Sequence, residues 1–250
     1  MSKNILITGA SSGIGEHLAL ELAKRGNNLA LCARNEDKLN SLSERIRAAH
    51  PKVTVVWHRL DVQEDQTIAP TINILASKLG QLDTVIANAG IAGGGAAGSG
   101  RFEEDRAIIR TNVLGAMATV DAAVALFRQQ GKGHIVAISS VAAFRGMPKA
   151  GAYCASKAAL ATYMEAVEAE HYHSPIDVTT LFPGYIDTPL NQMLKNRPFL
   201  ISVEKGAQVI ADLIEKRVHR STVPVYPWSL IGRMLKVVPT RLLASQGSFT

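Results

Sequence analysis

Three side chains in the middle of the chain could together move a proton on and off a substrate oxygen: Ser140, Tyr153 and Lys157. Tyr153 and Lys157 are four residues apart, a spacing that puts both side chains on one face of a helix and within reach of one pocket. A tyrosine with a pKa of about 10 is mostly protonated at neutral pH, and a nearby ammonium group stabilises its phenolate. The hydroxyl of Ser140 could donate a hydrogen bond to a carbonyl oxygen on which negative charge develops. The set favours acid–base chemistry at a carbonyl or an alcohol, although a Tyr/Lys pair alone arises on many helices by chance.

A second group of residues, near the N-terminus, is suited to holding phosphate. The segment Thr8-Gly9-Ala10-Ser11-Ser12-Gly13-Ile14-Gly15 follows a short apolar run and leads into a stretch with helical spacing. Glycines let the backbone turn sharply and approach a pyrophosphate, and the start of a helix offers free N–H groups and the positive end of its dipole. The glycine spacing is G-x-x-x-G-x-G, which differs from the G-x-G-x-x-G fingerprint of larger dehydrogenases. The turn predicts a dinucleotide as ligand.

The residues after the second apolar run indicate which dinucleotide is bound. Folds that select NAD place a carboxylate here, on the ribose 2′-hydroxyl, where it would repel a 2′-phosphate. This chain has Arg34 instead, a permanent cation that can pair with phosphate through two hydrogen bonds. Glu36 and Asp37 follow, but we expect them to begin the next helix, where acidic residues are favoured. The prediction is therefore NADP(H).

Short apolar runs alternate with longer amphipathic stretches along the chain. The expected strands are Asn4–Thr8, Asn28–Ala33, Val53–Arg59, Asp83–Ala87, His134–Ser139, Asp177–Phe182 and, more weakly, Thr222–Tyr226. The expected helices are Gly13–Arg25, Asp37–Ala49, Gln63–Lys78, Phe102–Gln130 and Ala150–His173. Strands that are apolar without alternation are typical of sheets covered on both faces. Repeated βα units predict a single-domain α/β fold, a Rossmann-type doubly wound parallel sheet whose ligands bind at the carboxyl ends of the strands.

These segments resemble the classical short-chain dehydrogenase/reductase family, and the resemblance continues to about residue 220. TGASSGIG is similar to the family's TGxxxGxG motif, and Ser140 with Tyr153 and Lys157 is similar to its Ser…YxxxK site. The resemblance implies that Ser140 orients the substrate, that Tyr153 is the general acid/base, and that Lys157 binds the ribose and activates the tyrosine. It also implies Asn112 as a fourth catalytic member, which holds a water in a proton relay to the lysine.

The resemblance further implies most of the cofactor contacts. Asp61-Val62 is similar to an adenine-binding pair, Asn88-Ala89-Gly90 to the NNAG element with Ala87 replacing its first Asn, and the segment from Pro183 to Thr188 to PGxxxT. Ser12 stands where NADP-using relatives often carry a second basic residue. With Arg34, the expected cofactor-binding residues are Gly9, Ser11, Ser12, Gly13, Ile14, Gly15, Arg34, Asp61, Val62, Asn88, Ala89, Gly90, Tyr153, Lys157, Pro183, Gly184, Ile186 and Thr188. No metal ion is expected.

The C-terminal tail carries the net charge of +6. Residues 216–250 hold six basic and no acidic residues, whereas the other 21 basic residues balance 21 acidic ones, so the charge does not indicate a nucleic-acid surface. We expect a dinucleotide-binding and catalytic domain in residues 1–226 and a basic amphipathic extension in residues 227–250. In that extension, apolar residues at helical spacing run from Leu230 to Leu242, with a break at Pro239.

Two roles for the extension are open. A basic amphipathic helix with a tryptophan, here Trp228, could lie on an anionic membrane surface. Its apolar face could instead pack on its own domain or on a partner subunit, which we favour. Many members of the family end in a glycine-rich strand that helps to build a tetramer. This chain has Tyr226-Pro227-Trp228-Ser229 and an extension in that place, so the resemblance does not support a tetramer. By analogy with the family, we expect a homodimer through the long helices that carry Asn112 and Tyr153.

Three segments are candidates for the walls of a substrate pocket: Gly93–Gly100, Ala142–Lys149 and Tyr185–Phe199. Their large side chains are Phe144, Met147, Tyr185, Leu190, Met193, Leu194 and Phe199, with Arg145 as the main charge. The composition favours a lipophilic ketone or acyl carbonyl over a sugar, although the same residues could pack a lid on the core. The run Gly93–Gly100 is either a flexible loop over the ligand or a plain surface connection.

The sequence therefore predicts an NADP(H)-dependent oxidoreductase that moves hydride between a nicotinamide and a carbonyl or secondary-alcohol carbon. A non-catalytic NADP-binding regulator is one alternative, but binding alone does not require all of Ser140, Tyr153 and Lys157. An epimerase or dehydratase is another, which the lack of an added substrate domain disfavours. With two cysteines, no signal- or transit-peptide pattern and no apolar stretch expected to span a bilayer, we expect a cytoplasmic protein, membrane-associated only through its tail.

Overall fold

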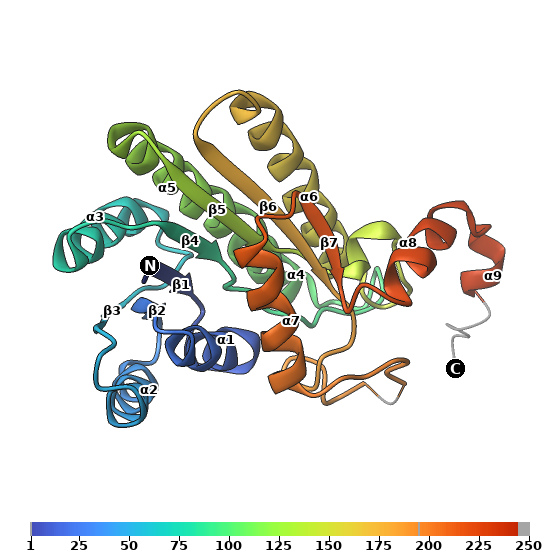
Figure 1. The fold of residues 1–250 in the computed structure, drawn as a ribbon. Coiled ribbons are helices and arrows are strands. Elements are labelled where there is room, and N and C mark those ends of the chain that lie inside the picture. The colour runs from blue at the N-terminus through green and yellow to red at the C-terminus, as the bar shows by residue number, and fades with distance from the viewer. Residues whose placement is uncertain (1, 195, 245–250) are drawn as a thin grey trace.

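One parallel sheet runs through the protein, a computed structural model that describes residues 2–194 and 196–244 (Figure 1). Within the described residues its seven strands are β1 (Asn4–Thr8), β2 (Asn28–Ala33), β3 (Val55–Arg59), β4 (Thr84–Ala87), β5 (Gly133–Ile138), β6 (Ile176–Pro183) and β7 (Arg220–Val223). Their order is β3-β2-β1-β4-β5-β6-β7, and every pairing is parallel. The order reverses between β1 and β4, and the crevice at their carboxyl ends is where such sheets bind ligands.

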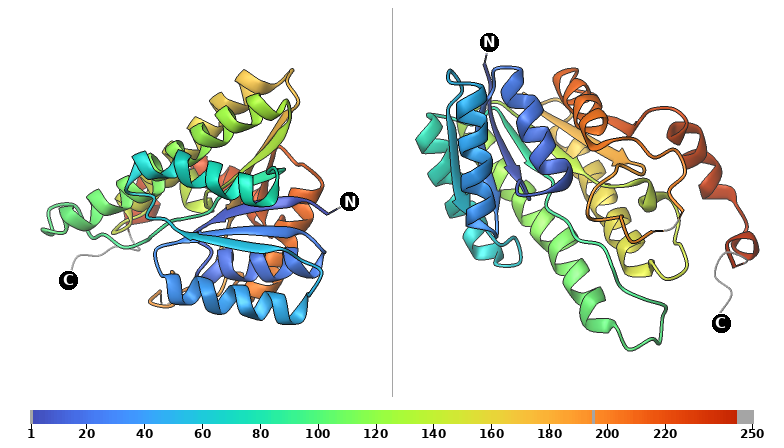
Figure 2. Two further views of the ribbon diagram at one scale, coloured as in Figure 1. Left: turned by 90° about the vertical axis from the view of Figure 1, so that its left-hand side faces the viewer. Right: turned by 90° about the horizontal axis from the view of Figure 1, so that it is seen from below.

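Helices cover both faces of the sheet (Figures 1 and 2). On one face lie α1 (Gly13–Lys24), α2 (Glu36–Ala49) and α7 (Val203–Glu215), and on the other α3 (Ile68–Leu79), α5 (Ala116–Gln130) and α6 (Gly151–His171). The remaining helical elements are η1 (Asp65–Thr67), α4 (Phe102–Ile109), a π-helical turn (Arg110–Gly115), η3 (Val141–Phe144), α8 (Trp228–Val237) and α9 (Thr240–Ala244). The predicted Rossmann-type doubly wound sheet is confirmed.

Successive residues of a central strand belong to two different cores. On β5, Val136 packs in the core under α1, α2 and α7, whereas Ile135 and Ala137 pack in the core under α3, α5 and α6. Side chains of a strand alternate between its two faces, so a strand buried on both faces must be apolar throughout. This explains why the strand segments of the sequence show no alternation.

Two elements near the C-terminus differ from the prediction. Helix α7 was not expected, although Ser202 caps it by accepting a hydrogen bond from the Lys205 N–H at 3.2 Å. Strand β7 is shifted toward the N-terminus and ends at Val223, because Pro224 has no N–H to continue the ladder. Strand β7 pairs with the end of β6, so it still completes the sheet.

The helical segment Phe102–Gln130 has the bounds predicted from the sequence, but it is more apolar than the sequence analysis allowed for. Among the described residues it is the one helix long and apolar enough to cross a membrane. Half of its most apolar window is buried inside the protein, and Val120, Ala123 and Phe127 belong to the core beneath α5. Its apolar face is thus occupied by the sheet.

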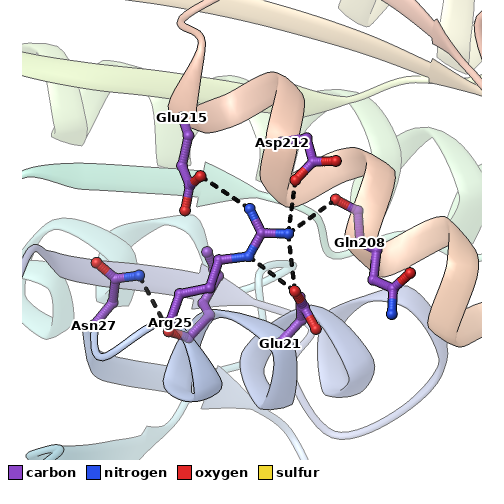
Figure 3. A network of polar contacts seen from close by, with 7 residues as sticks. Glu21, Arg25, Asn27, Gln208, Asp212 and Glu215 are labelled. Carbon is purple, nitrogen blue, oxygen red and sulfur yellow. Dashed lines mark hydrogen bonds and ion pairs between the residues drawn. The ribbon is translucent and has the colours of Figure 1, made fainter.

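A single guanidinium group joins α1 to α7 (Figure 3). Arg25, at the end of α1, lies 2.7 Å from the carboxylate of Asp212 and 2.9 Å from that of Glu215, both on α7. It also donates hydrogen bonds to Glu21 of its own helix, at 2.8 Å, and to the Gln208 carbonyl, at 3.3 Å. The unpredicted helix is therefore fixed to the helix that begins at the glycine turn.

Candidate active site

Glycines shape a backbone cradle between the end of β1 and the start of α1. A Cβ atom on Gly9, whose φ is +68°, would lie 2.7 Å from the Cα of Ala89, and one on Gly15 would lie 2.3 Å from the Gly9 carbonyl oxygen. Neither position can therefore carry a side chain without moving the backbone. Ser12 precedes the helix in an extended conformation, and its hydroxyl caps none of the described N–H groups of α1. The cradle leaves helix N–H groups available, so it fits the pyrophosphate of a dinucleotide.

The end of β4 is locked onto this cradle by Thr8, which sequence reasoning did not assign. The buried Thr8 hydroxyl accepts hydrogen bonds from the N–H groups of Asn88, at 3.1 Å, and Ala89, at 3.2 Å. The Asn88 amide donates to the Thr8 carbonyl at 2.9 Å. Asn88 thus fixes two strand ends at the point where the strand order reverses.

The nucleotide side of the crevice continues along β2 and β3. Arg34 is exposed directly after β2, and Asn35 caps α2 by accepting a hydrogen bond from the Lys38 N–H at 2.9 Å. Glu36 and Asp37 lie in the first turn of α2, as predicted from their charge. The two acidic residues therefore belong to the helix, and Arg34 is the charged residue at the end of β2.

The acid–base set forms at the end of β5. The Tyr153 hydroxyl is hydrogen-bonded to the Ser140 side chain. Burial raises the pKa of Tyr153, and the bond with Ser140 acts in the opposite direction. Ser140 also accepts from the Ala142 N–H at 3.1 Å and donates to the Pro183 carbonyl at 3.4 Å. The last bond is long, so this hydroxyl can turn toward a substrate oxygen.

Lys157 lies beneath the tyrosine in a buried position. Its ammonium nitrogen donates to the Ile138 carbonyl at 3.0 Å and lies 5.9 Å from the centroid of the Tyr153 ring. Burial lowers the pKa of Lys157 to about 8. The backbone around it is also fixed, because the Ser139 hydroxyl donates to the Lys157 carbonyl at 2.9 Å. At neutral pH the side chain is still mostly a cation and can stabilise a phenolate.

Asn112 is fully buried in the π-helical turn, not solvent-exposed as a mid-helix asparagine usually is. Its amide accepts from the Ile91 N–H at 2.8 Å and donates to the Ile91 carbonyl at 2.9 Å and to the Ser156 hydroxyl at 3.0 Å. Ser156 donates in turn to the Tyr153 carbonyl at 2.7 Å. A Cβ on Gly90 would lie 3.3 Å from both the Asn112 amide oxygen and the Lys157 nitrogen. Asn112 therefore joins the loop after β4 to the helix that carries the tyrosine.

The segment after β6 closes the crevice from the other side. Thr188 is buried next to the cradle, since a Cβ on Gly13 would contact its side chain at 3.5 Å. The Ile186 carbonyl accepts a hydrogen bond from Asn191 at 2.7 Å. Residues Ile186 and Ile201 form an isolated parallel bridge, which closes the base of the loop between them. The two ends of the segment, Pro183 and Thr188, thus lie against Ser140 and the cradle respectively.

Trp228, at the start of α8, is a site residue that the sequence analysis did not assign. It is buried against Gly184, and the rings of Tyr185 and Phe199 meet it edge-on, with centroids 5.8 and 6.0 Å away. Its indole N–H is buried without a hydrogen-bond partner among the described residues. The contact with Gly184 could not be seen in the sequence, because the two residues are 44 positions apart. The one sequence signal was a tryptophan at the start of an apolar helical segment.

The structure brings the predicted residues together at the carboxyl edge of the sheet. Those around the cradle are Gly9, Ser11, Ser12, Gly13, Ile14, Gly15, Asn88, Ala89, Gly90 and Thr188. Asp61 and Val62 follow β3, where the Val62 carbonyl packs on Gly115. A bound dinucleotide would supply or accept hydride here, beside a hydroxyl pair able to donate a proton.

Comparison with known proteins agrees with this geometry. The short chain dehydrogenase family matches residues 3–198, and the chain belongs to this family. An uncharacterized oxidoreductase of Mycobacterium tuberculosis is 36% identical over 241 residues, which cover 96% of this chain and 95% of that protein. The protein is thus an oxidoreductase of the short-chain dehydrogenase/reductase family.

Two solved structures show which class of cofactor occurs on this fold. An alcohol dehydrogenase from the archaeon Thermococcus sibiricus, complexed with 5-hydroxy-NADP, aligns with a TM-score of 0.80 and 27% identity over 89% of this chain and 96% of its own. A 3-ketoacyl-(acyl-carrier-protein) reductase from Brucella melitensis, complexed with NADH, aligns with a TM-score of 0.77 and 25% identity over 85% and 90%. Structural neighbours therefore bind nicotinamide cofactors of both the phosphorylated and the unphosphorylated kind.

Proposed function

We propose that the protein is an NADP(H)-dependent reductase of a lipophilic ketone or acyl carbonyl, or in reverse a secondary-alcohol dehydrogenase. The observation that carries the proposal is the Tyr153 hydroxyl, hydrogen-bonded to Ser140 and set above the buried Lys157. The Lys157 nitrogen lies next to Gly90, in the loop that Asn88 fixes to the cradle that fits a dinucleotide.

In this proposal Tyr153 moves the proton. Its raised pKa keeps the phenol protonated at neutral pH, so it can donate to the substrate oxygen as the carbonyl is reduced. Ser140 turns from the Pro183 carbonyl to donate a second hydrogen bond to the same oxygen. The ammonium of Lys157 then stabilises the phenolate until a proton from solvent restores it. In the oxidation direction the same groups accept the alcohol proton.

The choice of NADP(H) rests on Arg34. It is the first residue after β2, exposed at the edge where the adenosine ribose lies in folds of this type. The nearby carboxylates of Glu36 and Asp37 are held in the first turn of α2. A fixed guanidinium in this position favours a 2′-phosphate over a 2′-hydroxyl.

A lipophilic substrate is supported by the aromatic residues beyond the tyrosine. Tyr185 and Phe199 both contact Trp228 at the side of the crevice formed by the segment after β6. An apolar wall with a few convergent polar groups is typical of sites for small lipophilic molecules. The same set would offer a sugar few hydrogen-bond partners.

We also propose a homodimer through the outer faces of α5 and α6, and a cytoplasmic site of action. The first rests on family analogy and would appear as twice the chain mass in light scattering. The second is supported by the chain's two cysteines, Cys32 and Cys154, which are both buried and unpaired, as fits a reducing compartment.

The test is NADPH oxidation, followed by absorbance, with a panel of 3-oxoacyl thioesters, steroids, quinones and small ketones. For any substrate that is turned over, Tyr153→Phe should lower kcat by about 10²–10⁴ while leaving NADPH binding intact. Tyr163→Phe, on the same helix but outside the site, is the matched control. Full activity of Tyr153→Phe would contradict the proposal. Tight NADPH binding with no turnover of any substrate would instead favour a non-catalytic regulator.

A further inference from the structure

Helix α8 is apolar on two opposite faces. One face packs on the protein, where Trp228 is buried and Gly232 lies so close to Phe144 that a Cβ would be 2.5 Å from its ring. Ile231 and Leu235 are half-buried on this same face. The expectation that an apolar face of the tail packs on its own domain therefore holds for one side of the helix only.

The opposite face presents three large apolar side chains to solvent. Leu230 is 55% exposed, Met234 56% and Val237 79%, and their spacing of four and three residues aligns them in one stripe. We call these three residues the outer stripe. Their exposure is not needed for packing, because the inner face of α8 already holds the helix on the protein.

The outer stripe does not stand alone. The loop between Ile186 and Ile201 also leaves apolar side chains in solvent, among them Met193, which is 92% exposed, and Phe199. Phe199 contacts Trp228 at the start of α8, so loop and helix lie side by side (Figures 1 and 2). Exposed apolar surface gathered on two neighbouring segments indicates an interaction site.

The charged side chains of α8 and α9 themselves have one sign. Arg233 and Lys236 lie on the flank of α8 and Arg241 on α9, all exposed, and residues 216–250 contain no acidic residue. Arg145 holds this region in place by donating to the Val238 carbonyl and to the Thr240 hydroxyl, both at 2.9 Å. A second copy meeting the stripe across a two-fold axis would bring like charges together. A surface rich in anionic lipid is complementary to both the apolar stripe and its basic border.

We propose that α8 and the adjoining loop dock on an anionic lipid surface, with the outer stripe inserted among the acyl chains and the basic residues on the head groups. The proposal is independent of the reaction, since none of the outer-stripe residues touches the candidate active site. It places Phe199 and Trp228, which lie at the side of the candidate active site, close to the lipid.

The test uses flotation of the full chain with vesicles of phosphatidylcholine alone and with about 30% phosphatidylserine. We expect binding to the anionic vesicles only, weakened by raising salt from about 0.1 to 0.5 M. A triple variant, Leu230→Ser with Met234→Ser and Val237→Ser, should lower the bound fraction about tenfold or more. Reversal of charge in Arg233→Glu with Lys236→Glu should do the same.

The matched control is Ile74→Ser with Tyr172→Ser, which removes exposed apolar side chains from α3 and the end of α6. It should bind as the unchanged protein does. All variants should keep their thermal unfolding midpoint and their NADPH affinity, which separates loss of docking from loss of fold. Equal binding of the triple variant, or equal binding to both vesicle types, would overturn the proposal. So would the absence of vesicle binding together with an outer-stripe-dependent dimer in light scattering.

Discussion

The indole of Trp228 lies directly against Gly184. A Cβ on Gly184 would be 2.1 Å from the indole nitrogen, far inside contact distance. Gly184 follows β6 in the segment that resembles the family's PGxxxT element, whereas Trp228 begins the C-terminal helix α8. The tail that departs from the family is therefore built into the wall of the site.

Gly184→Ala should displace Trp228 and loosen α8. We expect a loss of about 1–3 kcal/mol in the free energy of unfolding, since the added methyl overpacks a closed contact. Gly146→Ala, at a position with open space around it, should change stability little. In the background of Trp228→Ala the effect of Gly184→Ala should largely vanish. Denaturant unfolding of the unchanged protein, the two single variants and the double variant measures the coupling between the two positions. If the two effects add, the contact with Trp228 is not the cause of the loss of stability in Gly184→Ala.

Asn112→Ala should destabilise the protein by about 2–4 kcal/mol, because it leaves the part-buried N–H and carbonyl of Ile91 without their partner and opens a cavity at a fully buried position. The exposed Asn73 on α3 supplies the control, and Asn73→Ala should cost less than about 0.5 kcal/mol. Chemical denaturation gives both values. A loss of under 1 kcal/mol for Asn112→Ala would mean that water replaces the amide without penalty.

The stability of the protein without cofactor should depend on the charge of Lys157. Its pKa falls from 10.5 to about 8 on folding, so the folded state resists binding this proton. The resulting penalty is complete below pH 8 and disappears as the pH rises toward 10.5, and it amounts to about 3 kcal/mol. Lys157→Met removes the titration. The stability advantage of this variant at pH 7 should therefore shrink by pH 10, and a constant difference across this range would contradict the lowered pKa.

Arg34→Ala should raise the KM for NADPH by about 10- to 100-fold, as expected for the loss of a charge-assisted contact. The KM for NADH should change little, since the 2′-hydroxyl does not need the cation. Lys38→Ala removes a nearby exposed cation and serves as control. Steady-state kinetics with both cofactors provide the measurement. An equal effect on the two cofactors would show that Arg34 does not read the phosphate.

The sheet and the chemistry of the site could be predicted from sequence because both depend on local patterns. Unbroken apolar runs such as that of β5 mark strands buried on two faces, and the glycine turn and the Tyr153/Lys157 spacing need only neighbouring residues to be recognised. Gly15 shows the reason, since a Cβ atom there would lie 2.3 Å from the carbonyl oxygen of Gly9, in the same turn.

Features that depend on distant contacts could not be predicted. Trp228 reaches Gly184 only because β7 and two prolines bring the tail back to the end of β6. The burial of Asn112 depends on the loop after β4, which supplies Ile91. Helix α7 is different: Ser202 and the amphipathic stretch after it were visible in the sequence, and the prediction of this helix was missed, not impossible.

The bridge between Ile186 and Ile201 has a consequence for how substrate preference can change. Below the bridge, β6 holds one end of the loop, and the contacts of Arg25 with Asp212 and Glu215 hold α7, which begins just after the other end. Both ends of the loop are thus anchored on rigid elements. Substitutions in the part of the loop beyond Thr188 can alter the molecules it admits while the phosphate cradle at α1 stays in place, so selectivity can change there without a change in cofactor binding.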